Sequence, residues 1–431
     1  MAYSLVEKVT GSKGDFTVAV RKKARYVNED LCTGCGACAE KCPTAVTDEY
    51  EMGLGKRKAI YKYYAQGIPS VFCIDPDYCR TLTGKKCGVC EKICEAKAID
   101  YKQEDKILEL NVGAIILSTG YDLFDAARLP EYGYGRLPNV VNAMEFERLL
   151  SASGPTEGHV ERPSDLRDHH LIKTSEKKLK KATKSLASYE KKHKMPSADF
   201  YKQFTAGNIS DGDEFPKWAK QYESVQEATK KLEELKTRAE KFDIATRLAF
   251  IQCVGSRDFR FNKYCSSYCC MHTIKEAMMA KDHDARTEAY IFNMDLRTVG
   301  KGFEEYKVRG AEQIGLHYIR GRVAEITQDE NENPIIWFEE TTSQTPKSMT
   351  VDLAILAVAC EAPKGIEKIA EMVGVELDEN RFFRTDPLNP LDTTVPGIFV
   401  CGCAQRPMDI PESVAQASSA ASRAAEAVLG G

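Results

Sequence analysis

Most of the sixteen cysteines stand close together in the sequence, at spacings that could hold metal. The first group is Cys32, Cys35, Cys38 and Cys42, with two, two and three residues between them and Pro43 directly after. This run is typical of bacterial ferredoxins, where closely spaced thiolates wrap one face of a cubane [4Fe-4S] cluster. The fourth cysteine of such a run ligates the other cluster of a pair. A second cysteine set is therefore expected further along.

The second set follows as Cys79, Cys87, Cys90 and Cys94. Two features differ from a minimal ferredoxin: seven residues separate the first two of these cysteines, and Glu95 stands where proline is usual. Cysteine pairs two residues apart also bind zinc, but two reciprocal runs favour iron–sulfur clusters. One predicted cluster takes Cys32, Cys35, Cys38 and Cys94, and the other takes Cys42, Cys79, Cys87 and Cys90.

A third group, Cys253, Cys265, Cys269 and Cys270, stands between an apolar strand and a helix. The end of a strand and the start of the next helix converge in a βαβ unit, and a helix N-terminus favours thiolates. Four thiols at this spacing can therefore meet. A buried cysteine cluster, or a labile dithiol at Cys269 and Cys270, is the alternative interpretation.

The whole-chain composition excludes several functions. A length of 431 residues predicts two to four domains, and a net charge of −4 gives no support to nucleic-acid binding. The first residues lack a basic stretch followed by an apolar core, so we expect no signal peptide and a reducing, cytoplasmic location. The longest apolar runs, 112–117 and 353–360, are too short to span a membrane.

Strand and helix patterns surround the cysteine groups. Residues 14–24 alternate as a strand, and 106–117 read as a strand pair that ends in a small-residue turn. Near the C-terminus, a strand at 397–401 leads through Gly402 into a helix rich in alanine and serine. Cys360, Cys401 and Cys403 are interpreted as core or small packing residues and are left out of the metal groups.

Residues 165–245 read as an inserted antiparallel helical hairpin. Within it, residues 171–193 hold eight lysines against two glutamates. A solvated helix face is one interpretation. A docking arm for an acidic partner subunit is the other.

Six stretches together resemble the A subunit of heterodisulfide reductase and its relatives. They are RKKARYVNEDLCTGCGACAEKCP, VGAIILSTGYD, MEFERLLSASGPT, IQCVGSRD, YCSSYCCMHTIKEA and DIPESVAQASSAA. The resemblance implies an α/β fold: an incomplete thioredoxin-reductase-like flavin domain with an inserted two-cluster ferredoxin domain and the hairpin. The expected units are partial flavin-binding segments at 1–24 and 104–164, the ferredoxin-like domain at 25–103, the hairpin at 165–245, a degenerate pyridine-nucleotide-like domain at 246–350 and a C-terminal flavin-binding portion at 351–431.

The resemblance also implies roles for residues. The Cys253, Cys265, Cys269 and Cys270 motif would bind a third [4Fe-4S] cluster. Lys275 would approach the flavin ring, where a cation stabilises reduced flavin; a solvated helix lysine is the alternative. The residues implied to line FAD are Thr119, Gly120, Gly402, Ser413, Val414 and Gln416.

One departure from the family concerns the flavin. Its members normally begin with a βαβ unit that carries the G-x-G-x-x-G fingerprint for the FAD pyrophosphate, and this sequence has no such fingerprint. Either FAD is absent or a separate polypeptide supplies the missing half. We favour a shared FAD, because the C-terminal flavin-facing segments would otherwise expose apolar surface.

The expected function is that of an electron-transfer oxidoreductase component that is active only within a cytoplasmic complex. The resemblance implies flavin-based electron bifurcation or confurcation, with a ferredoxin-like electron carrier and other heterodisulfide reductase-type subunits as partners. The same module in another low-potential complex, either aromatic-ring-reducing or quinone-linked, is one alternative. A scaffold without flavin, whose clusters only connect its neighbours, is the other.

Overall fold

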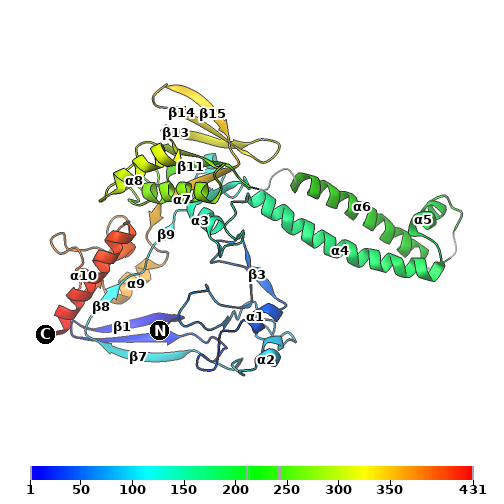
Figure 1. The fold of residues 1–431 in the computed structure, drawn as a ribbon. Helices are drawn as coiled ribbons and strands as arrows, with labels where there is room; N and C mark the ends of the chain where they lie inside the picture. Colours follow the sequence, from blue (N-terminus) through cyan, green and yellow to red (C-terminus); the bar gives the residue numbers. More distant parts are fainter. Residues whose placement is uncertain (1, 210–211, 213, 240–243, 430–431) are drawn as a thin grey trace.

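Two strands that are far apart in the sequence pair in space and bracket the first two cysteine groups. In the computed structural model, which describes residues 2–209, 212, 214–239 and 244–429, strand β2 (Asp15–Lys22) pairs antiparallel with β7 (Lys106–Val112). Strand β1 (Ser4–Ser12), which was not predicted, pairs with the other edge of β2. The intervening residues therefore leave and re-enter one small sheet, as an inserted unit does (Figure 1).

The inserted unit is built from very short elements around a small core. Its core joins Val27, Ile60 and Ile74 to several of the cysteines. An isolated bridge between Val27 and Ile99 closes its two ends. Its elements are α1 (Ala37–Lys41), β3 (Ala45–Thr47), β4 (Lys56–Lys58), β5 (Ile60–Tyr61), β6 (Cys73–Ile74) and α2 (Val89–Ile93).

A seven-stranded sheet forms the largest layer of the molecule, in the order β10-β16-β11-β12-β13-β14-β15. The first five strands are parallel, and the last two continue from β13 as an antiparallel extension. The strands are β10 (Val140–Asn142), β11 (Arg247–Val254), β12 (Glu288–Asn293), β13 (His317–Gln328), β14 (Pro334–Glu340), β15 (Thr345–Thr350) and β16 (Leu353–Val358). The helical elements that accompany them are α3 (Ala143–Leu150), α7 (Cys269–His283), α8 (Phe303–Arg309) and η3 (Gly310–Ile314).

This sheet differs from the predicted domain boundaries at both ends. Strand β10 and helix α3 belong to it rather than to the flavin-binding segment expected at 104–164, because β10 pairs with β16. Strand β16 lies inside the sheet, between β10 and β11, although a boundary was expected at 350/351. The sequence pattern showed these strands as buried, but it held no information on which sheet they join.

A second, smaller layer combines segments from the two halves of the chain. Strand β8 (Ile115–Leu117) pairs in parallel with β18 (Ile398–Val400), and β9 (Asp122–Leu123) pairs with β17 (Cys360–Glu361). A shared core joins β8 and β18 to β2. The surrounding helical elements are η1 (Ala126–Arg128), η2 (Pro130–Tyr132), α9 (Ile366–Val373), η4 (Gly402–Ala404) and α10 (Ile410–Leu429).

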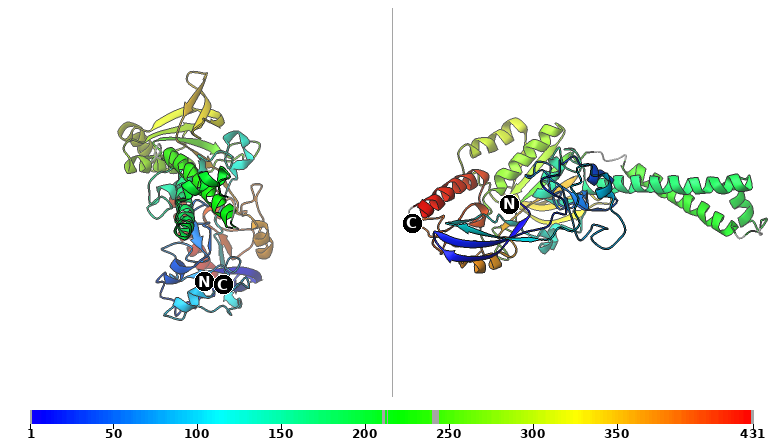
Figure 2. Two further views of the ribbon diagram at one scale, coloured as in Figure 1. Left: turned by 90° about the vertical axis from the view of Figure 1, so that its right-hand side faces the viewer. Right: turned by 90° about the horizontal axis from the view of Figure 1, so that it is seen from below.

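The predicted helical hairpin projects from the body as a long arm (Figures 1 and 2). Helices α4 (Pro163–His193) and α6 (Phe215–Ala239) pack along each other, and a short helix, α5 (Ser197–Thr205), occupies the connection that was expected to be a loop. At the far end, the ring of Trp218 stacks on Phe200 with 3.8 Å between ring centroids. Residues 240–243 of the predicted insertion lie outside the described residues.

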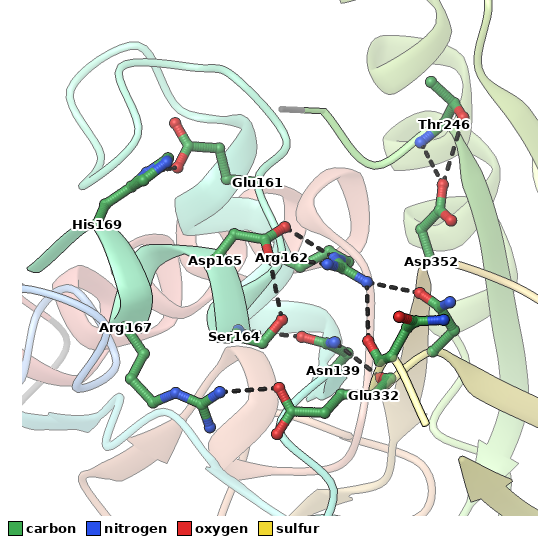
Figure 3. Close-up of polar contacts among 12 residues, drawn as sticks. Asn139, Glu161, Arg162, Ser164, Asp165, Arg167, His169, Thr246, Glu332 and Asp352 are labelled. Carbon is green, nitrogen blue, oxygen red and sulfur yellow. Dashed lines mark hydrogen bonds and ion pairs between the residues drawn. The ribbon is translucent and has the colours of Figure 1, made fainter. Parts of the chain in front are cut away.

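Polar contacts fix the base of the arm to the large sheet (Figure 3). The guanidinium of Arg162 donates to both carboxylate oxygens of Asp165, at 2.7 and 2.8 Å, and to Asn333 Oδ1 at 2.5 Å. The Asn139 side chain accepts from the Ser164 backbone N–H at 3.1 Å. The side chains of Arg162 and Asp165 are only 4% and 7% exposed, so the arm starts from a buried ion pair.

The predicted α/β class, with an inserted unit and a helical hairpin, is confirmed. Within the described ranges, no helix is both long and apolar enough to cross a bilayer.

We predict that Arg162→Met destabilises the protein by about 3–5 kcal/mol, because it leaves the Asp165 carboxylate buried without this cation. Arg384→Met is the control: the two side chains of its ion pair with Glu376 are 62% and 64% exposed, and its loss should cost less than about 1 kcal/mol. Urea-induced unfolding followed by circular dichroism measures both. Equal, small losses would show that the buried pair does not anchor the arm.

Candidate metal centres

Four cysteines of the inserted unit line a single cavity. They are Cys42, Cys79, Cys87 and Cys90, the set that the ferredoxin spacing assigns to one cluster. The rest of the cavity wall includes the apolar side chains of Ile60, Ile74 and Val89. Four thiols facing one largely apolar space fit the donor set of a cubane iron–sulfur cluster.

The other cysteine set of this unit gathers around helix α1. The thiol of Cys38 interacts with those of Cys32 and Cys35, and Cys94 packs in the same core. The backbone turns tightly before the helix, as expected, with Gly34 and Gly36 at φ values of +70° and +88°. A side chain at Gly34 would place its Cβ 2.6 Å from a backbone oxygen, so the turn requires glycine.

The third cysteine group lies at a strand end and a helix start, the elements that the sequence predicted for it. Cys253 lies near the end of β11, and Cys269 and Cys270 begin α7. The Cys253 thiol interacts electrostatically with those of Cys265 and Cys270, and the Cys269 thiol interacts with that of Cys270. Cys253 holds a φ of +61°, which is strained for a residue other than glycine.

Burial opposes ionisation of these thiols in the protein alone. It raises the pKa of both Cys38 and Cys253 to about 11. The adjacent Cys269 thiol has the opposite effect on its neighbour and lowers the pKa of Cys270 to about 7. A bound cation reverses the cost of burial, because thiolate is the form that ligates metal.

Several donors point at cysteine sulfurs. The Tyr101 hydroxyl lies 2.9 Å from Cys90 Sγ, and the Ala98 backbone N–H donates to Cys94 Sγ at 3.3 Å. Backbone N–H groups of Ser267 and Arg297 donate to Cys265 and Cys270 at 3.4 Å. Hydrogen bonds to sulfur stabilise negative charge and tune cluster potentials. Sequence patterns did not point to Tyr101 or Arg297, since no spacing rule links them to a cysteine.

Across the part of the chain that the structure describes, no three His, Cys, Asp or Glu side chains are positioned to hold one metal ion together. The choice between iron–sulfur clusters and zinc therefore rests on the spacing of the cysteines in the sequence.

A polar cavity adjoins the third cysteine group at the carboxyl ends of β11 and β12. Cys253, Arg257 and Asn293 contribute to its lining. Both amide atoms of Gln252 and the hydroxyl of Ser256 are buried there, and no described residue gives them a hydrogen-bond partner. Sequence patterns gave no signal for these two side chains, because both lie within an otherwise ordinary strand and turn.

The residues expected to contact FAD gather at one edge of the β8–β18 pair. Both strands run parallel, so the turns after them, at Thr119–Gly120 and Gly402, lie at the same end. The Gly402 N–H donates to Gln416 Oε1 at 3.0 Å, and Ser413 lies beside Gly402. The buried Thr119 hydroxyl has no hydrogen-bond partner among the described residues. A Cβ at Gly120 would meet nothing within 4 Å, so this edge is open to a ligand.

The same region exposes apolar side chains. Ile410 and Val414 on α10 are 78% and 63% exposed, and Ile116 on β8 is 40% exposed. Parallel strands normally occur in larger sheets that are covered on both faces, whereas this pair has two strands. The segments that were expected to line a flavin therefore leave apolar surface exposed in this structure.

Lys275 is exposed on α7, five positions after Cys270. The next residue, Glu276, is buried and forms an ion pair with His272 at 3.0 Å. No contact in the structure assigns Lys275 to the open edge at Gly120, and its approach to a flavin stays a prediction.

Comparison with known proteins supports the ferredoxin-type unit. A family described as "4Fe-4S binding domain" matches residues 25–46, which contain the first cysteine run. Among solved structures, the thioredoxin reductase of Lactococcus lactis is similar at 13% identity over 86% of each chain, with a TM-score of 0.37. A superposition this loose carries no argument about function.

Curated relatives match along almost the whole chain. The iron-sulfur A subunit of the CoB–CoM heterodisulfide reductase of Methanocaldococcus jannaschii is 38% identical over 98% of this chain and 52% of its own length. The second of two such A subunits in Methanopyrus kandleri is 40% identical over 100% and 54%. A protein of Archaeoglobus profundus, named as similar to the same reductase component, is 37% identical over 100% and 56%. The chain spans about half the length of the curated relatives it matches.

Proposed function

We propose, from its similarity along nearly the whole chain to part of the heterodisulfide reductase A subunit, that this protein is an iron–sulfur electron-transfer component. It works within a cytoplasmic oxidoreductase complex of the heterodisulfide reductase type and takes part in flavin-based electron bifurcation or confurcation. The observation that carries the proposal is the convergence of four thiols, Cys42, Cys79, Cys87 and Cys90, on one cavity.

Three groups of thiols would hold three [4Fe-4S] clusters. When bound, the clusters supply one-electron transfer, and a flavin links such steps to two-electron chemistry. The protein surrounds the thiols with apolar side chains and directs N–H and O–H donors at their sulfurs. The three proposed ligand sets are Cys32, Cys35, Cys38 and Cys94; Cys42, Cys79, Cys87 and Cys90; and Cys253, Cys265, Cys269 and Cys270.

A partner chain would complete the FAD site. The open edge of the β8–β18 pair offers backbone groups to further strands, and the exposed face of α10 offers apolar surface for them to cover. The unpartnered hydroxyl of Thr119 and the open position at Gly120 fit a ligand there. Gly402, Ser413, Val414 and Gln416 would line the same ligand, and the Lys275 ammonium would tune its charge.

The arm would dock a partner protein of the complex. On α4, the side chains of Lys177, Lys178, Lys181 and Lys184 are exposed, and within the described ranges none of them forms an ion pair. A cluster of unneutralised cations on a long projection attracts an acidic surface and steers its approach. The ferredoxin-like electron carrier and the terminal reductase belong to the same proposed assembly.

Removal of one ligand tests the third cluster. Cys269→Ala should lower the iron content by about four atoms per chain, the content of one cubane, and leave the inserted unit loaded. Iron and acid-labile sulfide, measured on anaerobically purified protein, give the result. Cys73→Ala is the control, since Cys73 is buried outside the proposed ligand sets. Unchanged iron in the Cys269 variant would remove the third cluster from the proposal.

Removal of the unpartnered hydroxyl tests the flavin site. Thr119→Val should lower the FAD content of the purified complex several-fold without loss of iron, because its hydroxyl faces the open edge. Fluorescence of acid-released flavin measures the content. Thr341→Val, at an exposed position after β14, is the control. If the complex with the native threonine held clusters but no FAD, the protein would instead be a scaffold whose clusters only pass electrons between its neighbours.

Charge removal tests the docking arm. A variant with glutamine at Lys177, Lys178, Lys181 and Lys184 should keep its helix content but release a partner protein at lower salt than the native chain does. Affinity co-purification over a salt series measures the release. Glutamine at Lys230 and Lys231 on α6 is the control. Identical salt profiles for all three proteins would assign the lysines to a solvated face.

A further inference from the structure

The two halves of the inserted unit repeat one local structure around their cysteines. Helices α1 and α2 both have five residues, and each follows a glycine with positive φ. Cys38 and Cys90 stand at the second position of these helices, and Cys42 and Cys94 directly follow the helices. The two halves therefore present their cysteines in the same way.

The repeat continues into the turn that comes after each helix. Asp48 and Asp100 each accept, through Oδ1, a hydrogen bond at 3.0 Å from the backbone N–H two residues further along. Glu49 and Tyr101 come directly after these aspartates. Glu49 and Tyr101 thus occupy equivalent positions in the two halves of the unit.

The chemistry at these two equivalent positions differs. The Tyr101 hydroxyl lies 2.9 Å from Cys90 Sγ. The Glu49 carboxylate instead accepts from Arg57 Nε and Nη2 at 2.7 and 3.0 Å, and its side chain is 57% exposed. A carboxylate has no proton to donate to a sulfur. A side-chain donor therefore contacts a cysteine sulfur in the second half but has no counterpart at the same position in the first.

Metal ligation would fix the direction of the Tyr101 hydrogen bond. A ligating cysteine is a thiolate without a proton, so the hydroxyl must donate and the Cys90 sulfur must accept. Reduction adds one negative charge to an iron–sulfur cluster and its sulfur ligands, and a donor hydrogen bonds more strongly to the more negative acceptor. The Tyr101 hydroxyl therefore favours the reduced state of a cluster held by Cys90.

Burial acts in the opposite direction at the same ligand set. Two of its cysteines are buried, whereas Cys35 of the other set in this unit is exposed. Because a buried charge is poorly solvated, burial alone disfavours the more negative, reduced cluster. The Tyr101 hydroxyl supplies a donor where water is excluded. The Lys58 ammonium, which donates to the Cys42 carbonyl oxygen at 3.0 Å, adds a positive charge beside the same set.

We propose that Tyr101 raises the reduction potential of the cluster held by Cys42, Cys79, Cys87 and Cys90 and so offsets the effect of burial on that potential. The inference rests on the proposed iron–sulfur function. Tyr101 acts through the Cys90 sulfur and is not itself a ligand. The two clusters of the inserted unit would then accept an electron by different means, one with more access to solvent and the other with a tyrosine hydroxyl.

A redox titration of the full chain tests this role. Native protein and Tyr101→Phe, both purified anaerobically, are titrated potentiometrically while electron paramagnetic resonance follows the reduced clusters. One midpoint should shift to lower potential in the variant, because loss of the hydrogen bond makes reduction about fivefold less favourable. Tyr26→Phe is the control, since Tyr26 packs against the same core without a hydrogen bond to a cysteine sulfur among the described residues. Its midpoints should match those of the native chain.

Iron and acid-labile sulfide content separate the possible failures. Unchanged midpoints in Tyr101→Phe at full iron content would overturn the role of Tyr101 and leave the proposed function intact. A native chain without iron would overturn both. If Tyr101→Phe fails to hold its clusters, Tyr101→3-fluorotyrosine keeps the ring and hydroxyl in place. Its more acidic hydroxyl is a stronger donor and should shift the same midpoint to higher potential; no shift, or a shift to lower potential, would contradict the proposal.

Discussion

The architecture depends on one constraint: the thiols of each proposed ligand set must be brought close together inside the protein. A buried thiolate is costly without a cation, and burial alone raises the pKa of Cys38 and Cys253 well above that of a free thiol. Secondary-structure elements hold the cysteines of each group in position. In the inserted unit these are two five-residue helices, α1 and α2, each of which follows a glycine with positive φ. In the large sheet, β11 and α7 converge in the same way.

Local sequence spacing predicted the first two groups because most cysteines of a ferredoxin run lie only a few residues apart in the sequence. The third group needed only the general geometry of a strand followed by a helix. The contact of Tyr101 with Cys90 could not be predicted in this way, because no spacing rule links the two residues. The same limit applies to the pairing of β10 with β16: burial was readable in the sequence, but neighbours across a sheet were not.

Some of the remaining elements hold parts of the molecule together, and others leave surface exposed. The antiparallel pairing of β2 with β7 holds the inserted unit, and the polar contacts of Arg162 and Asn139 hold the arm. The β8–β18 pair is different, since it leaves its edge and the outer face of α10 open. The proposed transfer of electrons between partners requires such surfaces, because carriers must come close to exchange electrons. Among the described residues, the arm and the open edge both offer exposed surface of this kind.

The most direct test is an anomalous-difference map, collected at the iron absorption edge from anaerobically grown crystals of the complex. We expect three compact iron peaks per chain. One lies among Cys32, Cys35, Cys38 and Cys94, one among Cys42, Cys79, Cys87 and Cys90, and one among Cys253, Cys265, Cys269 and Cys270. A map with no iron at these groups, or with single zinc ions in their place, would contradict the assignment of this chain as an iron–sulfur protein.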